Sequence, residues 1–156
     1  MLNKELIEKS KNSVLCWLAT SNKNNEPNVS PKEIFLFKDD STLLIAHIAS
    51  PNSISNIKEN PNVCVSFIDI FVQKGFKIKG IAQLIDSNNN QFKNNLNLLT
   101  STFTNKFPIN IIIEVAVLEV DTIQAPSYIF FPETTEHSQI ESAWNIYKSK
   151  VDGQYQ

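Results

Sequence analysis

The chain has 156 residues, of which 42% are hydrophobic and 19% charged, a size and composition that suit one domain with a full core. The formal net charge of −2 at pH 7 excludes a general attraction to nucleic acid. All 14 basic residues are lysines. An anion site must therefore use lysine charges, hydroxyls and backbone N–H groups, without the bidentate fork of arginine.

Two features bear on the cellular compartment. Cys16 and Cys64 lie in apolar runs, without C-x-x-C spacing or a neighbouring histidine, which disfavours zinc and favours buried free thiols in a reducing cytosol. The N-terminus is amphipathic and lacks the apolar core of a signal peptide, and Glu114 and Glu119 interrupt the longest apolar run. The sequence therefore predicts a cytoplasmic protein with no membrane-spanning segment.

Apolar periodicity and turn residues define the elements of the first half. An N-terminal helix is expected to have Leu2, Leu6 and Ile7 along its apolar edge and Asn3 as its cap. Strands are expected over residues 13–20, 28–38 and 42–48, the first of them buried on both faces and the last two paired as a hairpin. Pro31 falls inside the second strand and indicates a sheet edge or a bulge there.

A short helix is expected directly after the strand 42–48. Ser50 can cap it, Pro51 suits its first position, and Pro61 ends it. Asn52 and Ser53 are small and polar, so the unpaired N–H groups of the first turn would stay accessible. Such a turn binds anions, above all phosphate; an ordinary connector helix is the alternative interpretation.

The second half alternates strands with longer helices. Strands are expected over 63–68, 76–85 and 109–120, and Gly80 in mid-strand indicates a tight bend or a closely passing backbone. A long amphipathic helix is expected from Phe92 to Phe107, closed by Pro108, and a last helix carries apolar residues at Ile140 and three, four and seven residues beyond it. The pattern predicts a mainly β (α+β) domain built on a small antiparallel barrel of about six strands, decorated by helices.

Five segments follow one another in a recognisable order, namely NSVLCWLAT, PNVSPKE, LLIAHIASPNSISNIKENPNV, VSFID and GFKIKGIAQLI. This series resembles the pyridoxamine 5′-phosphate oxidase-like family of FMN-binding split β-barrels, from Leu2 to about Val120. The resemblance implies a six-stranded antiparallel split barrel of Greek-key type with peripheral helices. The single domain would span residues 1–156, with the barrel over about 13–123 and a C-terminal loop and helix over 124–150.

What the resemblance further implies is a homodimer with two FMN sites at the subunit interface. The implied activity is that of a flavin-dependent oxidoreductase, acting on a small-molecule redox substrate or with a nicotinamide donor, with no nucleic acid and no membrane as partner. The cofactor-binding residues expected from the resemblance and from the helix start are Ser30, Pro31, Lys32, Ile45, Ala46, His47, Ser50, Asn52, Ser53, Gln73 and Lys74.

These residues have distinct expected roles. The segment 30–32 would lie along the flavin, 45–47 would pass under its ring, and the start of the short helix would hold the phosphate. Gln73 and Lys74 match a loop that in relatives reaches the ring or the partner's phosphate. Asn52 stands where many relatives have a basic residue, and losing one such contact would cost about 1.5–3 kcal/mol. Pyridoxamine phosphate oxidation itself is not expected, because in the family it relies on C-terminal arginine and histidine residues, and this chain has no arginine.

Other interpretations stay open for several residues. Lys32 could be a solvated edge lysine, and His47 could be structural or could ligate haem. Trp17 suits core packing and Trp144 a dimer interface. A barrel that has lost flavin and serves as an interaction module, or one that binds haem or a deazaflavin, is the alternative to an FMN protein.

Overall fold

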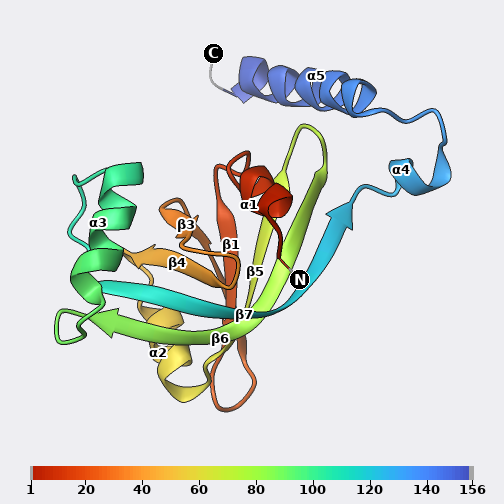
Figure 1. Cartoon of the computed structure of the whole chain (residues 1–156). Coiled ribbons are helices and arrows are strands. Elements are labelled where there is room, and N and C mark those ends of the chain that lie inside the picture. Colours follow the sequence, from red (N-terminus) through yellow and green to blue (C-terminus); the bar gives the residue numbers. More distant parts are fainter. Residues whose placement is uncertain (1, 155–156) are drawn as a thin grey trace.

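The computed structural model describes residues 2–154 and shows one strongly curled sheet with helices around it (Figure 1). In chain order the elements are α1 (Lys4–Ser10), β1 (Cys16–Ser21), β2 (Pro27–Lys32), β3 (Phe35–Phe37), β4 (Thr42–His47), α2 (Pro51–Glu59), β5 (Asn62–Asp69), β6 (Lys74–Asp86), α3 (Phe92–Thr102), β7 (Ile111–Gln124), α4 (Ser127–Phe130) and α5 (Glu136–Gln154). The mixed α+β class with an antiparallel split barrel is confirmed.

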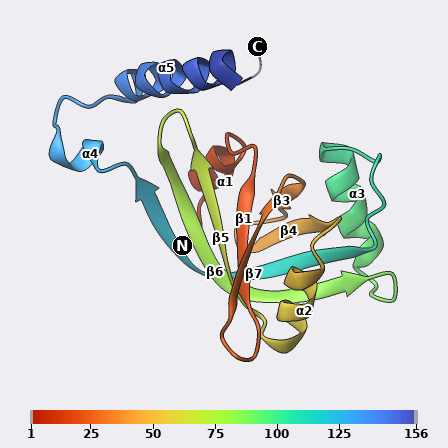
Figure 2. The same ribbon diagram turned by 180° about the vertical axis from the view of Figure 1, so that it is seen from behind.

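The connection between β2 and β3 explains why the sheet curls. The sheet has the order β2-β1-β5-β6-β7-β4-β3, so β2 and β3 are its outermost strands, yet only Glu33 and Ile34 separate them along the chain. In a flat sheet, six spacings of about 4.8 Å would hold these strands roughly 29 Å apart, whereas three residue steps reach about 11 Å. The sheet must therefore roll up until its two edges meet (Figure 2).

The same two residues account for the seventh strand. The stretch 28–38, expected as one strand, is divided at Glu33 and Ile34 into β2 and β3. Pro31 lies in the edge strand β2, as expected, and β3 pairs with β4 as a hairpin. The Ile34 carbonyl accepts a hydrogen bond of 2.9 Å from the Ala46 N–H, which joins the link to β4.

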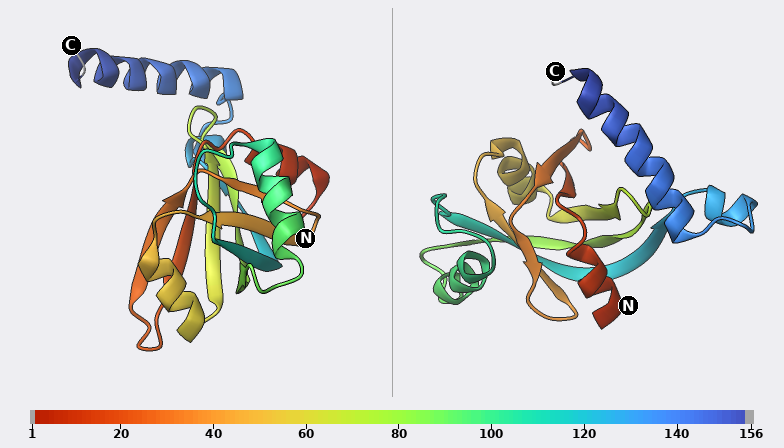
Figure 3. Two further views of the ribbon diagram at one scale, coloured as in Figure 1. Left: turned by 90° about the vertical axis from the view of Figure 1, so that its left-hand side faces the viewer. Right: turned by 90° about the horizontal axis from the view of Figure 1, so that it is seen from above.

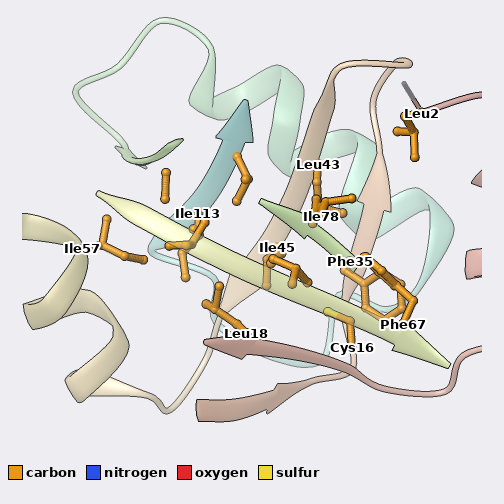
Figure 4. Close-up of a cluster of buried hydrophobic side chains, with 14 of the residues drawn as sticks. Leu2, Cys16, Leu18, Phe35, Leu43, Ile45, Ile57, Phe67, Ile78 and Ile113 are labelled. Atoms are coloured by element: carbon orange, nitrogen blue, oxygen red, sulfur yellow. The ribbon is translucent and has the colours of Figure 1, made fainter. Parts of the chain in front are cut away.

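The barrel interior is filled mainly by aromatic and aliphatic side chains from facing strands (Figure 4). Phe67 and Phe76 stack with ring centroids 4.8 Å apart, and Phe35 and Phe37 contact Phe67 at 5.4 and 5.5 Å. A second cluster lies beneath α3, around Leu99 and its neighbours on β4 and β7. Two apolar layers thus hold both faces of β4.

Gly80 sits where β6 bends, as its place in the sequence indicates. The register of β6 against β7 shifts between Lys79 and Gly80. A Cβ at Gly80 would lie 2.3 Å from the Ala116 carbonyl oxygen, a distance that no side chain tolerates. The absent side chain therefore lets the two backbones approach at this bend.

Two expectations about these elements are wrong. The strand 13–20 was expected to be buried on both faces, but Val14 is 83% and Trp17 42% exposed, because only the inner face of β1 meets the core. The helix expected to reach Phe107 ends at Thr102. Phe103 and Phe107 continue the apolar spacing beyond its end, but they lie in the loop that follows and contact parts of the chain distant in sequence.

The C-terminal segment with α4 and α5, residues 125–154, forms an arm that extends from the barrel (Figures 1 and 3). Its contacts gather at the tip of the β5–β6 hairpin, where Tyr128 donates to the Val72 carbonyl at 2.8 Å and Phe71 contacts Trp144 and Tyr147 at 6.1 and 5.9 Å. Most side chains of α5 are exposed. None of the helices within residues 2–154 combines the length and apolar character needed to cross a membrane.

Candidate cofactor site

The charged side chain of Lys32 lies at the centre of the candidate site. It ends β2 opposite Cys16 on β1 and is only 6% exposed. Its Nζ donates a hydrogen bond to Ser50 Oγ, and no ion pair within residues 2–154 includes it. Burial lowers the pKa of Lys32, an effect that the nearby Cys16 partly opposes. The structure thus holds a buried cation without an anionic partner.

The side chain of His47 completes a small polar cluster with Lys32 and Ser50. Its Nδ1 lies 3.2 Å from Ser50 Oγ, and its pKa is lowered first by burial and then by the charge of Lys32. At neutral pH the imidazole is therefore biased toward its neutral form. Ser50 holds the N-cap position of α2, but its hydroxyl makes no capping bond because Lys32 and His47 engage it, so the expected side-chain cap is wrong.

A second polar cluster joins the start of α2 to β1 and β2. Ser53 is fully buried, and its Oγ lies 3.1 Å from Ser30 Oγ and 3.4 Å from Asn28 Nδ2. Thr20 Oγ1 accepts hydrogen bonds from Asn28 at 3.3 Å and from Asn56 at 3.1 Å. These contacts fix the height of α2 against the sheet, and they occupy the Ser53 hydroxyl, which the sequence suggested for phosphate.

The Lys32 cluster borders a cavity of about 410 Å³, within the range of about 300–1,000 Å³ typical of ligand sites. Its walls come from β2, from the link to β3, from the end of β4 with the turn that follows, and from the loop before β7. The lining residues are Leu15, Ser30, Pro31, Lys32, Glu33, Ile34, Ala46, Ile48, Ala49, Ser50 and Phe107. Five expected residues are thereby brought together, namely Ser30, Pro31, Lys32, Ala46 and Ser50.

Other expected residues lie elsewhere in the chain. Ile45 points into the barrel core with no exposed surface, and Asn52 faces solvent at the start of α2. Gln73 and Lys74 are absent from the lining of the cavity and instead contact the arm. The Lys74 ammonium pairs with Glu136 at 2.8 Å, and Gln73 Oε1 accepts from Gln139 Nε2 at 2.9 Å.

The sequence reasoning missed several residues of the site. Phe107 forms part of the cavity wall although it was assigned to a helix, and Glu33 and Ile48 flank the segments that were chosen. Ile48 could have been found from the sequence, because it directly follows His47 and successive side chains of a strand point to opposite faces. No feature of the sequence marked Phe107, because its loop, about 60 residues beyond the end of β4, reaches the cavity only through the fold.

The antiparallel sheet, rolled up and flanked by helices, is a split barrel, and it holds a buried lysine beside a cavity at a helix start. The family model described as pyridoxamine 5′-phosphate oxidase matches residues 2–124. The chain therefore belongs to the pyridoxamine 5′-phosphate oxidase family. No curated protein is significantly similar to it in sequence.

Solved structures share the fold at low sequence identity. HupZ from Group A Streptococcus superposes with a TM-score of 0.69 at 18% identity, over 80% of this chain and 96% of its own. An FMN-binding protein from Syntrophomonas wolfei gives 0.64 at 18% identity, over 78% and 88%. The heme storage protein HutZ from Vibrio cholerae gives 0.62 at 18% identity, over 78% and 94%. At this identity the likeness establishes the fold alone.

Proposed function

We propose that this protein binds FMN in the cavity beside Lys32 and acts as a flavin-dependent oxidoreductase on a small organic molecule or with a nicotinamide donor. The observation that carries the proposal is the buried side chain of Lys32, whose ammonium makes no ion pair within residues 2–154. A charge removed from water is costly unless an opposite charge compensates it. A phosphate with a charge of about −1.5 to −2 at pH 7 would supply that compensation.

The residues around the cavity fit the two parts of this cofactor. Lys32 and the Ser50 hydroxyl offer donors to a phosphate. Leu15, Ile48 and Phe107 offer apolar surface to a flat ring. FMN, when bound, supplies hydride and electron transfer, and the protein positions it and excludes water. With Asn52 in place of a basic residue, Lys32 is the single cation among residues 2–154 that lines this cavity.

The test compares two flavins and two lysine variants. The purified protein is titrated with FMN and with riboflavin, which lacks the phosphate, and binding is followed by flavin fluorescence. Lys32→Met is expected to weaken FMN binding by about ten- to a hundredfold, the value of one charge-assisted contact, and to leave riboflavin binding unchanged. Lys23→Met, at an exposed lysine of the β1–β2 turn, is the matched control. Protein that ignores FMN at high micromolar concentration refutes the proposal.

Haem is the second candidate ligand. His47 lies half-buried in the Lys32 cluster and offers an imidazole, the commonest axial ligand of haem iron, and the similar structure HutZ is a heme storage protein. An absorption spectrum after adding hemin separates the two candidates. A Soret band that disappears in His47→Ala would favour haem, whereas indifference to both cofactors would favour a barrel that serves as an interaction module.

We further propose that two copies form a homodimer with cofactor sites at their interface. The arm exposes large apolar side chains on α4, with Phe130 at 72%, and on α5, with Trp144 at 56%. Exposed apolar surface of this kind is typical of interfaces. A dimer would also allow Gln73 and Lys74, which lie away from the cavity of their own protomer, to approach that of the partner. Sedimentation equilibrium at micromolar concentration tests the association, and a monomer there contradicts it.

A further inference from the structure

A second cavity, of about 380 Å³, lies on the other side of the β2–β3 link. It is enclosed by α1, β3 and the C-terminal end of α3, elements that lie at one end of the barrel (Figure 1). Its lining is mainly apolar and consists of Ile7, Ser10, Lys11, Ser13, Val14, Glu33, Phe35, Leu36, Phe37, Thr102 and Phe103. The volume is again that of a small-molecule site.

The aromatic wall of this second cavity has a defined geometry. Phe35 is almost fully buried and contacts Phe103 with ring centroids 6.4 Å apart and planes tilted by 43°. Val14, at the rim, is 83% exposed, and Phe103 is 44% exposed. Apolar side chains that border a hollow and remain in contact with water would gain free energy if an apolar ligand covered them.

Among the polar residues of the lining, Ser13 and Glu33 bear most on what the cavity would bind. Ser13 is only 6% exposed, and its hydroxyl makes no hydrogen bond within residues 2–154. Its oxygen keeps some solvent-accessible surface. A buried hydroxyl normally finds a partner. Glu33 contributes a carboxylate to the lining, and the cation Lys11 is already engaged by Glu8 at 2.7 Å. The cavity therefore favours a hydrogen-bonding group and disfavours a negative charge.

Glu33 lines both this cavity and the cavity beside Lys32. We infer that the second cavity is a binding site for a compact, uncharged, ring-containing molecule that carries one hydroxyl or carbonyl group. Because Glu33 lines both cavities, this ligand would lie across that residue from the proposed cofactor. The ring would lie against Phe35 and Phe103, and its polar group would bond to Ser13.

The test uses 2-naphthol as the probe and 2-naphthoate as its charged counterpart, in amide-resolved NMR titrations of the full chain. We expect 2-naphthol to bind saturably at about millimolar concentration or below and to shift the amides of Ser13 and Phe103. The carboxylate of 2-naphthoate is expected to bind about fivefold more weakly, the effect of one like charge at contact distance in water. Glu33→Gln should remove most of that difference.

A matched pair of bulky substitutions locates the ligand. Thr102→Trp, at the exposed rim, should weaken 2-naphthol binding by about tenfold, whereas Ser101→Trp, an exposed neighbour outside the lining, should leave it unchanged. Equal binding to the two variants, or no saturable binding, overturns the inference. FMN titration of the same samples keeps the proposals apart, because FMN binding without 2-naphthol binding rejects only the second site. Bound 2-naphthol without FMN binding supports the site while rejecting the flavin function.

Discussion

Lys32→Met should stabilise the protein without cofactor while weakening its affinity for FMN. The substitution keeps the length of the apolar stem and removes the charge of a residue that is 6% exposed and makes no ion pair within residues 2–154. It also removes one hydrogen bond to Ser50, but that hydroxyl retains His47 at 3.2 Å and is not left without a partner. The gain from removing the buried charge should therefore exceed the loss.

The expected gain is about 1 kcal/mol, the low end of the range of roughly 1–4 kcal/mol seen when buried ion pairs give way to apolar side chains of similar volume. The low end applies because Lys32 borders a cavity rather than the closed core. For a chain of this size the change corresponds to a rise in Tm of about 2–4 °C. Calorimetry or urea unfolding of cofactor-free protein measures it, with Lys23→Met as the control that should change little.

The pH dependence of the difference tests its cause. Because burial lowers the pKa of Lys32 in the folded state, the unfolded chain binds more protons between that lowered pKa and the ordinary value of 10.5. The wild-type protein therefore gains stability relative to Lys32→Met as the pH rises through this window, and the advantage of the variant shrinks. A variant less stable than wild type at neutral pH, or an advantage that grows with pH, would refute the reasoning.

Two further predictions concern the bend and the thiols. Gly80→Ala should destabilise the protein by about 1–3 kcal/mol or more, the cost of overpacking, because its Cβ would meet the Ala116 carbonyl. Gly153→Ala, with open space around it in a helix, should instead stabilise the protein by about 0.5–1 kcal/mol. Urea unfolding of both variants measures the two effects. Iodoacetamide should alkylate half-buried Cys64 before Cys16, whose pKa burial raises to about 12, as peptide mass mapping can show. Equal labelling would contradict the burial of Cys16.

Local sequence signals predicted most of the helices and strands but few of the contacts between them. Asn3 caps α1 as expected, its Oδ1 accepting from the Leu6 N–H at 2.9 Å, because capping depends on neighbours three residues away. The same rule predicted that the Ser50 hydroxyl would cap α2. That hydroxyl instead accepts a hydrogen bond from Lys32, 18 residues earlier in the chain. Competition from a distant partner is invisible to any local pattern.

The residue order of this chain by itself determined the alternation of its strands, the caps and prolines that bound its helices, and the close approach at Gly80, because these depend on backbone sterics and on periods of two and 3.6 residues. Only the tertiary structure decided that β2 and β3 sit at opposite ends of one sheet and meet by its curling. That closure buries Lys32 without a counter-charge and brings Phe107 to the cavity wall. Burial and proximity arise from contacts among segments far apart in the chain, and those contacts exist only once the sheet has rolled up.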